Sequence, residues 1–281
     1  MNKLTLIYLL GSGHCGSTLL DITLNNHSKI IGVGELENYD PTNEYTGGKS
    51  KFWQKVFSNI DWKQNLKVHQ TKFNFLANSN KYFYSINHDS PSKLSLVNNK
   101  DYAKKSDILY HNINSLSNKP YILDSSKEVP RGELIAKYSH LNVTILHMVR
   151  DGRAVMWSYK KKTGNIFKWS VLFKWAFTNI KIEIMKKRLK NTQVILIRYE
   201  DLIENPEKEI TKILSKFNLD FKPEILEFNK QERHQIGGNR MKLKKEIKLE
   251  KDLSWLKNLS YIEIKLFNLI FGWLNRKYGY K

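Results

Sequence analysis

Residues 4–20 read LTLIYLL-GSGHCGSTLL, and this stretch decides the fold. The apolar run predicts a buried strand, the glycines a tight turn, and the residues after them the start of a helix. Such a turn directs backbone N–H groups and the positive end of a helix dipole at one point, which favours a phosphate. Gly11 and Gly16 have the spacing of a nucleotide-binding P-loop, but Ser17 stands where an NTPase needs Lys. The loop therefore suits a phosphate and lacks the cation that handles a triphosphate.

A chain of 281 residues with 41% hydrophobic and 26% charged residues is expected to form one large domain, residues 1–281. Its 47 Lys and Arg exceed its 27 Asp and Glu by 20 charges, which favours anionic partners. The same excess is equally expected of a Lys-rich composition without a binding role. The single Cys15 excludes an intrachain disulfide and a cysteine-rich metal site, and it agrees with a reducing compartment. We therefore predict a cytoplasmic location.

Two apolar segments bear on membrane association. The run Leu4–Leu10 is too short to span a bilayer and lacks the flanks of a signal peptide. Near the C-terminus, five apolar residues fall on one face of an amphipathic helix: Ile262, Leu266, Leu269, Ile270 and Trp273. We expect this face to pack against the core rather than lie on a membrane, and we expect no transmembrane segment.

Strands and helices alternate along much of the chain. Apolar runs at 121–123, 143–149 and 194–197 predict strands, each followed by a helix-forming segment. This alternation predicts an α/β fold with a parallel sheet flanked by helices, in which ligands bind beyond the carboxyl ends of the strands. Residues 36–119 interrupt the pattern and are rich in Asn, Ser, Lys and aromatic residues. We interpret them as a mostly helical insertion over the core, which serves either a ligand pocket or structural padding.

Polar residues follow the strands and should meet in one crevice. After the strand at 143–149, Arg150 can donate two charged hydrogen bonds to a phosphate, and Ser158 and Lys162 lie on one face of the next helix. This cluster predicts a second phosphate site, separate from the glycine loop. The alternative is a surface ion pair between Arg150 and Asp151.

Three further features concern the same crevice. Lys127 could supply the cation that the loop lacks, or it is an exposed Lys at a helix start. Glu35 lies close to the loop in sequence, where a carboxylate beside an anion site indicates a proton acceptor. Residues 234–242 contain the sequence GGNR, which predicts either a loop that folds over a ligand or a simple turn.

Taken together, these motifs resemble those of the sulfotransferases that use 3′-phosphoadenosine 5′-phosphosulfate (PAPS), among them tyrosylprotein sulfotransferases and their bacterial relatives. The similar segments follow the family order: residues 4–20, 24–35, 124–127, 148–154, 198–202 and 234–240. The resemblance implies a P-loop-like α/β fold, PAPS as donor, adenosine 3′,5′-bisphosphate as product, and no metal. It does not extend to residues 36–119, which we interpret as a cap on the acceptor side.

The resemblance also implies roles for individual residues. Glu35 would be the catalytic base, and Lys127 the cation that helps the bridging oxygen leave. His14 stands where the family carries Arg or Lys, so it would be a catalytic cation if protonated beside the donor, a proton carrier, or a space-filling substitute. The implied donor-binding residues are Gly13, His14, Cys15, Gly16, Ser17, Thr18, Arg150, Ser158, Lys162, Tyr199, Gly238, Asn239 and Arg240.

The motifs do not fix the acceptor, because fold and donor site do not determine it. A hydroxyl of a saccharide, a peptide tyrosine or a small metabolite would serve. Two other classes of function stay open. A P-loop kinase would bind ATP with magnesium, against which the absent loop Lys argues. A basic polyanion-binding protein would bind with steep salt dependence, but the aromatic residues show no stacking pattern, so we predict no specific nucleic acid partner.

Overall fold

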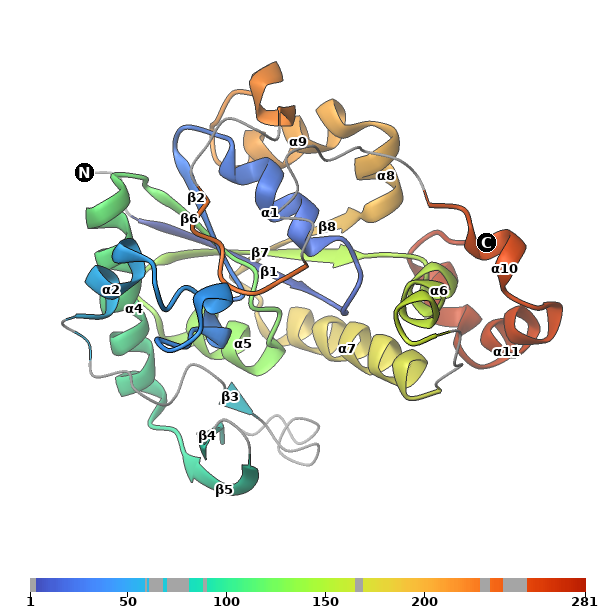
Figure 1. Ribbon diagram of the computed structural model, residues 1–281, viewed down its shortest axis with the longest axis horizontal. Helices are drawn as coiled ribbons and strands as arrows, with labels where there is room; N and C mark the ends of the chain where they lie inside the picture. Colours follow the sequence, from blue (N-terminus) through green and yellow to red (C-terminus); the bar gives the residue numbers. More distant parts are fainter. Residues whose placement is uncertain are drawn as a thin grey trace.

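Five parallel strands form the central sheet of the computed structural model, which describes residues 4–58, 60, 68–69, 81–87, 90–164, 169–227, 233–239 and 252–281 (Figure 1). Their order across the sheet is β2-β6-β1-β7-β8. The bounds are β1 Thr5–Gly11, β2 Ile30–Gly34, β6 Tyr121–Asp124, β7 Asn142–Val149 and β8 Gln193–Arg198. The three strands predicted after residue 119 are present, and their alternation with helices confirms the predicted α/β fold.

Alternate residues of β1 face opposite sides of the sheet. Leu6, Tyr8 and Leu10 pack with α4, α5 and α7 on one side, and Ile7 and Leu9 pack with α1, α8 and α9 on the other (Figure 1). Because helices cover both faces, the strand is apolar throughout rather than alternating. The bounds are α1 Ser17–Asn25, α4 Asn99–Ser117, α5 Val129–Tyr138, α7 Trp169–Arg188, α8 Tyr199–Glu204 and α9 Pro206–Ser215.

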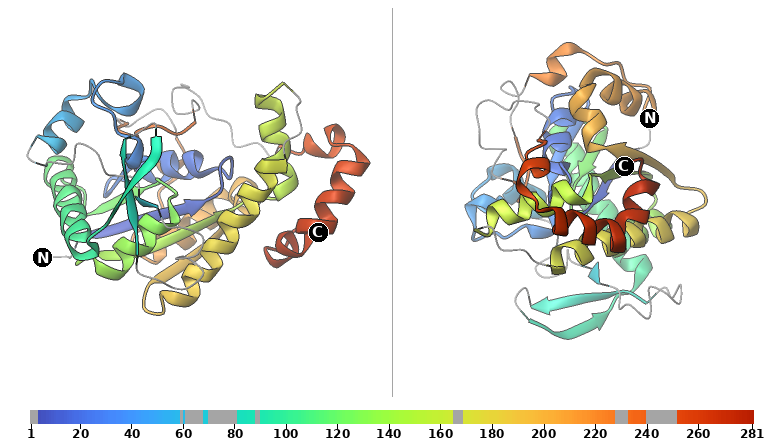
Figure 2. Two further views of the ribbon diagram at one scale, coloured as in Figure 1. Left: turned by 90° about the horizontal axis from the view of Figure 1, so that it is seen from below. Right: turned by 90° about the vertical axis from the view of Figure 1, so that its right-hand side faces the viewer.

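The segment 36–119 contains a small sheet besides its helices. Its elements are the 3-10 turns η1 Leu36–Asn38 and η2 Glu44–Thr46, helices α2 Lys51–Phe57 and α4, and strands β3 Val68–His69, β4 Phe83–Asn87 and β5 Ser90–Leu96. Among the described residues of this segment, those in helices and 3-10 turns outnumber those in strands. The antiparallel sheet β3-β4-β5 was not predicted, because the Ser, Pro and Lys of β5 obscure a strand pattern. It lies apart from the central sheet in Figure 1 and in the right-hand view of Figure 2.

Helix α4 belongs to the core rather than to a lid. Its residues Leu109, Tyr110 and Ile113 are fully buried against the side of the sheet that α5 and α7 also cover. The predicted insertion therefore combines a crossover helix between β2 and β6 with peripheral elements.

The C-terminal region packs on α6 and α7 as a third hydrophobic cluster. It consists of α10 Trp255–Asn258 and α11 Tyr261–Lys277, and α6 spans Gly152–Lys162. The 3-10 turn η3 Pro223–Leu226 belongs instead to the cluster that contains α1 and α9. The face of α11 that was expected to pack on the core is exposed: Ile262, Leu266, Leu269, Ile270 and Trp273. The helix buries Phe267, Phe271 and Leu274 instead, and the Phe267 ring lies 5.7 Å from that of Trp175. The prediction was wrong because α11 carries two apolar faces, and periodicity does not select between them.

A buried ion pair fixes the carboxyl end of β6. Arg131 Nη1 donates to Asp124 Oδ2 at 2.7 Å, and both side chains are fully buried. The Tyr110 hydroxyl donates to the same oxygen at 2.7 Å, while the backbone N–H of Ser126 donates to Oδ1 at 2.9 Å. Both carboxylate oxygens are satisfied, as a buried charge requires. These bonds fix the backbone conformation between the end of β6 and Lys127.

Replacing Arg131 should destabilise the whole domain. In Arg131→Leu the Asp124 carboxylate stays buried without its cation, which costs about 3–5 kcal/mol. Chemical denaturation measures the loss as a lower midpoint at an unchanged slope. The control is Lys105→Met, which removes an exposed pair with Asp101 (3.2 Å) and should change stability by less than about 0.5 kcal/mol. Equal midpoints for the two variants would contradict the structural role of Arg131.

Candidate active site

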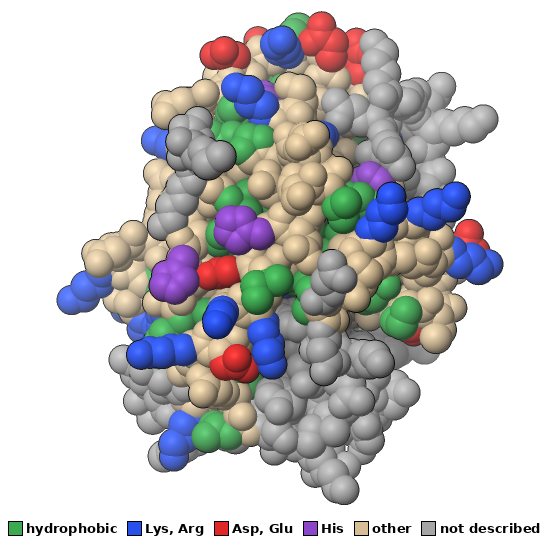
Figure 3. Space-filling view, turned by 90° about the vertical axis from the view of Figure 1, so that its left-hand side faces the viewer, with side chains coloured by type: hydrophobic (Ala, Val, Ile, Leu, Met, Phe, Trp, Pro, Cys, Tyr) green, Lys and Arg blue, Asp and Glu red, His purple; other side chains and the backbone are tan. Residues whose placement is uncertain are grey.

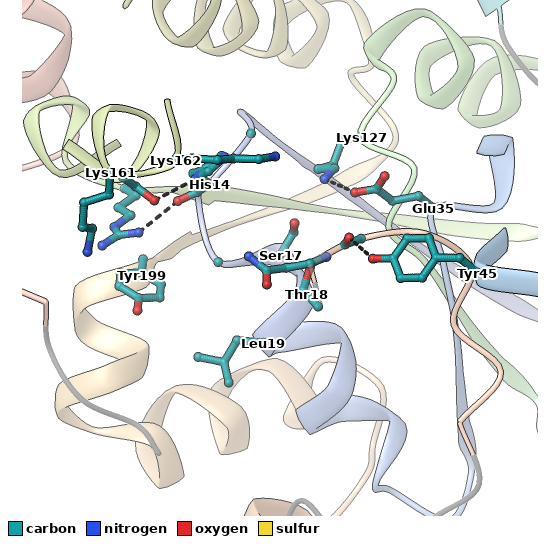
Figure 4. A pocket seen from close by; sticks show the side chains of 16 residues that line it. His14, Ser17, Thr18, Leu19, Glu35, Tyr45, Lys127, Lys161, Lys162 and Tyr199 are labelled. Atoms are coloured by element: carbon teal, nitrogen blue, oxygen red, sulfur yellow. Dashed lines mark hydrogen bonds and ion pairs between the residues drawn. The ribbon is translucent and has the colours of Figure 1, made fainter. Parts of the chain in front are cut away.

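A cavity of about 930 Å³ opens at the carboxyl ends of the central strands. Its lining residues are Gly13, His14, Gly16, Ser17, Thr18, Leu19, Glu35, Tyr45, Lys127, Arg150, Ser158, Lys161, Lys162, Tyr199, Gly238 and Asn239. In Figure 4, Lys127 and Glu35 lie at one end and Tyr199 and Lys161 at the other, with Ser17 between them. The strand ends that were expected to converge therefore meet in one cavity.

The glycine loop forms the floor of this cavity. Gly16 is the N-cap of α1 and has φ 97°, and a Cβ atom there would lie 2.3 Å from the ring of Tyr199. Glycine is therefore required both for the left-handed backbone and for the contact with the ring. The loop ends at the helix N-terminus, as the sequence predicted, so α1 directs its positive dipole end into the cavity.

Cys15 was predicted to contact the donor, but its side chain does not line the cavity. The thiol is fully buried in the core behind the loop, and burial raises its pKa. A Cβ atom on Gly11 would lie 2.7 Å from the Cys15 sulfur, so the two small residues pack against each other. Cys15 fills space under the loop rather than facing a ligand.

Arg150 is held between the loop and α8. Its Nη1 donates to the carbonyl of His14 at 3.1 Å, and its guanidinium lies 4.4 Å from the centre of the Tyr199 ring. Its Nε is buried and has no hydrogen-bond partner among the described residues. The alternative pairing with Asp151 is wrong, because Asp151 instead binds Arg153 at 2.7 Å. Arg150 thus retains an unused donor.

His14 connects the loop to α6. Its Nδ1 lies 2.7 Å from Ser158 Oγ, and its ring contacts that of Tyr159 at 4.0 Å between centroids with a tilt of 33°. Burial, together with the charges of Lys162, Arg150 and Lys127, lowers the pKa of His14 from 6.5 to about 4. The imidazole is therefore neutral at pH 7 in the ligand-free protein. Its φ of 64° is uncommon for a residue with a side chain.

Glu35 and Lys127 form an ion pair through Oε1 and Nζ (Figure 4). Asn38 Nδ2 donates to the other carboxylate oxygen at 2.8 Å, so both oxygens are engaged. Burial is the largest influence and lowers the pKa of Lys127, but the charge and hydrogen bond of Glu35 together with the Cys15 and Glu37 side chains outweigh it, so the net shift of the pKa is upward. Lys127 also has a left-handed backbone, with φ 67°. The expected cation and the expected base are thus in direct contact.

A segment from the C-terminal part of the chain supports this pair. Ile236 donates its N–H to the Val33 carbonyl at 2.9 Å, and its carbonyl accepts from the Glu35 N–H at 2.7 Å. A Cβ atom on Gly34, which has φ 73°, would lie 2.5 Å or less from the backbone of Ile236. The segment therefore extends the edge of β2 and sets the direction in which Glu35 leaves it.

The same segment then crosses the loop. The Asn239 N–H donates to Thr18 Oγ1 at 3.1 Å, and the Tyr45 hydroxyl donates to the Gly238 carbonyl at 2.5 Å. Gly238 and Asn239 thus lie over the start of α1. Of the two interpretations of this segment, the position favours a loop that covers a ligand, rather than a simple turn. Arg240, the last predicted donor residue, lies outside the described residues.

Sequence reasoning missed Leu19 and three polar residues of this site. Asn38 stands three residues after Glu35 within one 3-10 turn, and that spacing was a usable signal. Lys161 lines the cavity next to the predicted Lys162 and binds Asp252 at 2.8 Å. Tyr45 comes from the segment 36–119, where no motif marks it.

The described residues contain no group of three or more His, Cys, Asp or Glu side chains that could hold a metal ion. Among the helices that the structure describes, each is too short or too polar to cross a bilayer.

Comparison with known proteins identifies the class. The family model described as "Sulfotransferase family" matches residues 7–223, most of the chain. The chain therefore belongs to the sulfotransferase family, as the sequence motifs predicted. A comparison with curated protein sequences gives no match.

Solved structures agree with the fold. The sulfotransferase domain from the Synechococcus PCC 7002 olefin synthase has a TM-score of 0.63 and 17% sequence identity, and the similarity covers 100% of this chain and 96% of that one. The sulfotransferase domain from the curacin biosynthetic pathway has a TM-score of 0.50 and 21% identity, covering 84% and 81% of the two chains. At these identities the comparison establishes the shared fold.

The protonation of His14 gives a direct test of the site's electrostatics. In the ligand-free protein, an NMR titration of its imidazole should have a midpoint at about pH 4, with His14→Gln to assign the signal. Adenosine 3′,5′-bisphosphate should raise the midpoint, because its phosphates offset the cations that lower it. Between pH 6.5 and about 4, the His14 imidazole is protonated in the unfolded chain and neutral in the folded one. His14 therefore lowers the free energy of unfolding as the pH falls from 6.5 to about 4. A ligand-free midpoint of 6.5 or above would contradict the assigned surroundings.

Proposed function

We propose that the protein transfers a sulfonyl group from PAPS to a hydroxyl group of an acceptor. The observation that carries the proposal is the separation of two cationic groups within one cavity, Lys127 at one end and Arg150 at the other, on either side of the glycine loop. A donor with a phosphosulfate at one end and a 3′-phosphate at the other matches this arrangement. The cavity's volume is also in the range of nucleotide-sized ligand sites.

The residues at the Arg150 end of the cavity suit the 3′-phosphate. Arg150 has a buried Nε without a partner, so a phosphate oxygen would satisfy it with a charge-assisted hydrogen bond. Ser158 and Lys162 project from α6 into the same cavity. Gly238 and Asn239 line the same cavity, where the Asn239 N–H donates to Thr18, and they would contact the nucleoside.

The residues at the Lys127 end of the cavity suit the sulfonyl group that is transferred. PAPS supplies an activated sulfonyl group, whose bond to the phosphate oxygen breaks as a bond to the acceptor oxygen forms. In our proposal Glu35 takes the proton of the acceptor hydroxyl, and Lys127 stabilises the charge on the departing phosphate oxygen. Movement of Lys127 from Glu35 to that oxygen would free one carboxylate oxygen for the proton, while Asn38 continues to hold the other.

The acceptor would approach from the side of the segment 36–119. A second cavity, of about 350 Å³, borders the Glu35 carboxylate, and its other lining residues are Asn38, Asp40, Tyr45, Thr46, Gly237 and Gly238. Four of these come from the segment that we propose as the acceptor-side cap. The polar lining is compatible with a saccharide, a peptide tyrosine or a small hydroxylated metabolite. A cytoplasmic location belongs to the same proposal.

The surface offers less support for a polyanion-binding protein. On the face drawn in Figure 3, Lys and Arg side chains lie in small groups with acidic and uncharged side chains between them. Binding along a nucleic acid backbone uses a basic patch or stripe. The basic residues that line the cavity instead surround a site of limited volume.

Replacing the proposed base should remove transfer while leaving donor binding intact. Glu35→Gln keeps the side chain's size and loses its capacity to take a proton, so turnover should fall about a hundredfold or more. The measurement is incorporation of labelled sulfonyl from PAPS into lysate components, beside calorimetric binding of adenosine 3′,5′-bisphosphate. Glu44→Gln is the matched control, because its carboxylate is exposed and contacts Lys49 alone among the described residues. A Glu35→Gln protein with undiminished turnover would remove this residue from the role of base.

Binding of the product nucleotide tests the donor site and separates the classes of function. Adenosine 3′,5′-bisphosphate should stabilise the protein against heat, by about 2.7 kcal/mol at a hundredfold excess over its dissociation constant. Arg150→Gln should weaken that binding by about 1.5–3 kcal/mol, whereas Arg276→Gln, an exposed control, should not. Stabilisation by ATP with magnesium instead would indicate a kinase. No stabilisation by either nucleotide, together with salt-sensitive binding of heparin, would indicate a polyanion-binding protein.

A further inference from the structure

The outer face of α11 is unusually apolar for a protein surface. Leu269 has 79% of its surface exposed and Trp273 has 53%, although the helix also carries a fully packed inner face. Tyr261 and Ile262, in the first turn of the helix, are more than half exposed as well. Single exposed apolar residues need no explanation, but a continuous apolar face does.

Helix α7 lies beside α11 (Figure 2) and also exposes aromatic side chains. Phe173 of α7 packs edge-on against Phe271 of α11, with 5.3 Å between ring centres, and stacks with Phe177 along its own helix at 6.2 Å. Phe173, Phe177 and Trp169 all have exposed surface. We call this surface the α7/α11 face, defined by Trp169, Phe173, Phe177, Tyr261, Ile262, Leu266, Leu269, Ile270 and Trp273.

Helix α11 is anchored at both ends, so its outer face has a fixed orientation. At the N-terminus, Ser260 and Glu263 form a capping box, and Lys160 of α6 donates to Glu263 at 2.7 Å. Near the C-terminus, Asn275 accepts from the Gly152 N–H and donates to Asp151, both at 3.1 Å. The apolar face is thus presented by a docked helix rather than by a frayed chain end.

The charges on α7 and α11 that form no ion pair with another described residue are positive. Helix α7 has five Lys and Arg and one Glu, and α11 has three Lys and Arg and one Glu. Both carboxylates are already bound to lysines, Glu263 to Lys160 and Glu183 to Lys186 at 3.2 Å. Lys174, Lys265 and Arg276 are exposed on the same two helices. The face therefore combines aromatic and aliphatic groups with exposed cations.

We propose that the α7/α11 face docks onto an anionic lipid bilayer surface. Helices that lie in the interface of a membrane insert an apolar face below the headgroups and place Lys and Arg against anionic lipids. Trp and Tyr favour that boundary because their rings are amphipathic. A second copy of this chain fits less well, since each copy carries a net charge of +20 and brings the same basic face.

Vesicle binding by the full chain tests the proposal. The protein should co-sediment with vesicles of phosphatidylcholine and phosphatidylglycerol at least about tenfold more strongly than with phosphatidylcholine alone. The double variant Leu269→Glu/Trp273→Glu should lose at least about tenfold of that affinity. The matched control is Ile108→Glu/Leu116→Glu on α4, where the residues are 45% and 44% exposed and the charge change is the same. The control should bind as the parent protein does.

Three results would overturn the proposal. The parent protein could fail to bind anionic vesicles at low salt. Both double variants could lose affinity equally, which would assign binding to net charge alone. Light scattering could show a dimer that only the Leu269/Trp273 variant dissociates, which would assign the face to a second copy. If circular dichroism shows that this variant is unfolded, Leu269→Ser/Trp273→Ser takes its place with the same expected loss.

Discussion

The buried pair of Asp124 and Arg131 is the constraint on which the site depends. A buried ion pair contributes little net stability, because desolvation of both charges offsets their attraction. Here the pair instead fixes the positions of the neighbouring backbone segments. Asp124 ends β6 and accepts from both the N–H and the hydroxyl of Ser126, and the same hydroxyl accepts from the Glu37 N–H at 3.3 Å. One network therefore fixes the chain before Lys127 and the chain after Glu35, and the contact between these two residues follows from it.

Much of this could be predicted because parallel strands deliver their carboxyl ends to one edge. The glycine loop, Lys127 and Arg150 were each placed at a strand end from local pattern alone, and the cavity contains all three. The role of Asp124 could not be predicted in this way. Its partner Tyr110 lies on α4, inside the segment that was interpreted as a mostly helical insertion without individual helices, so the buried network has no local signature.

Two side-chain orientations could not be predicted, for a common physical reason. The direction of the Cys15 side chain and the buried face of α11 depend on what packs behind each element, whereas the sequence gives only the position of a residue within the element. Cys15 turns inward because Gly11 leaves room for it, and α11 turns Phe267 inward because Trp175 offers an aromatic contact. Sequence periodicity reports which residues share a face, but it does not report which face a neighbouring element covers.

Burial and the charges that line the cavity determine the protonation of His14. Lys127, Arg150 and Lys162 act together on His14, and with burial they keep its imidazole neutral. The cavity thus concentrates positive charge, which the carboxylates of Glu35, bound to Lys127, and Asp252, bound to Lys161 at 2.8 Å, offset in part. An anion that enters lowers the cost of protonating His14 and competes with Glu35 for Lys127. The substitution of His for a permanent cation in the loop therefore makes one charge of the site depend on the ligand, whereas an Arg or Lys there would keep it fixed at neutral pH.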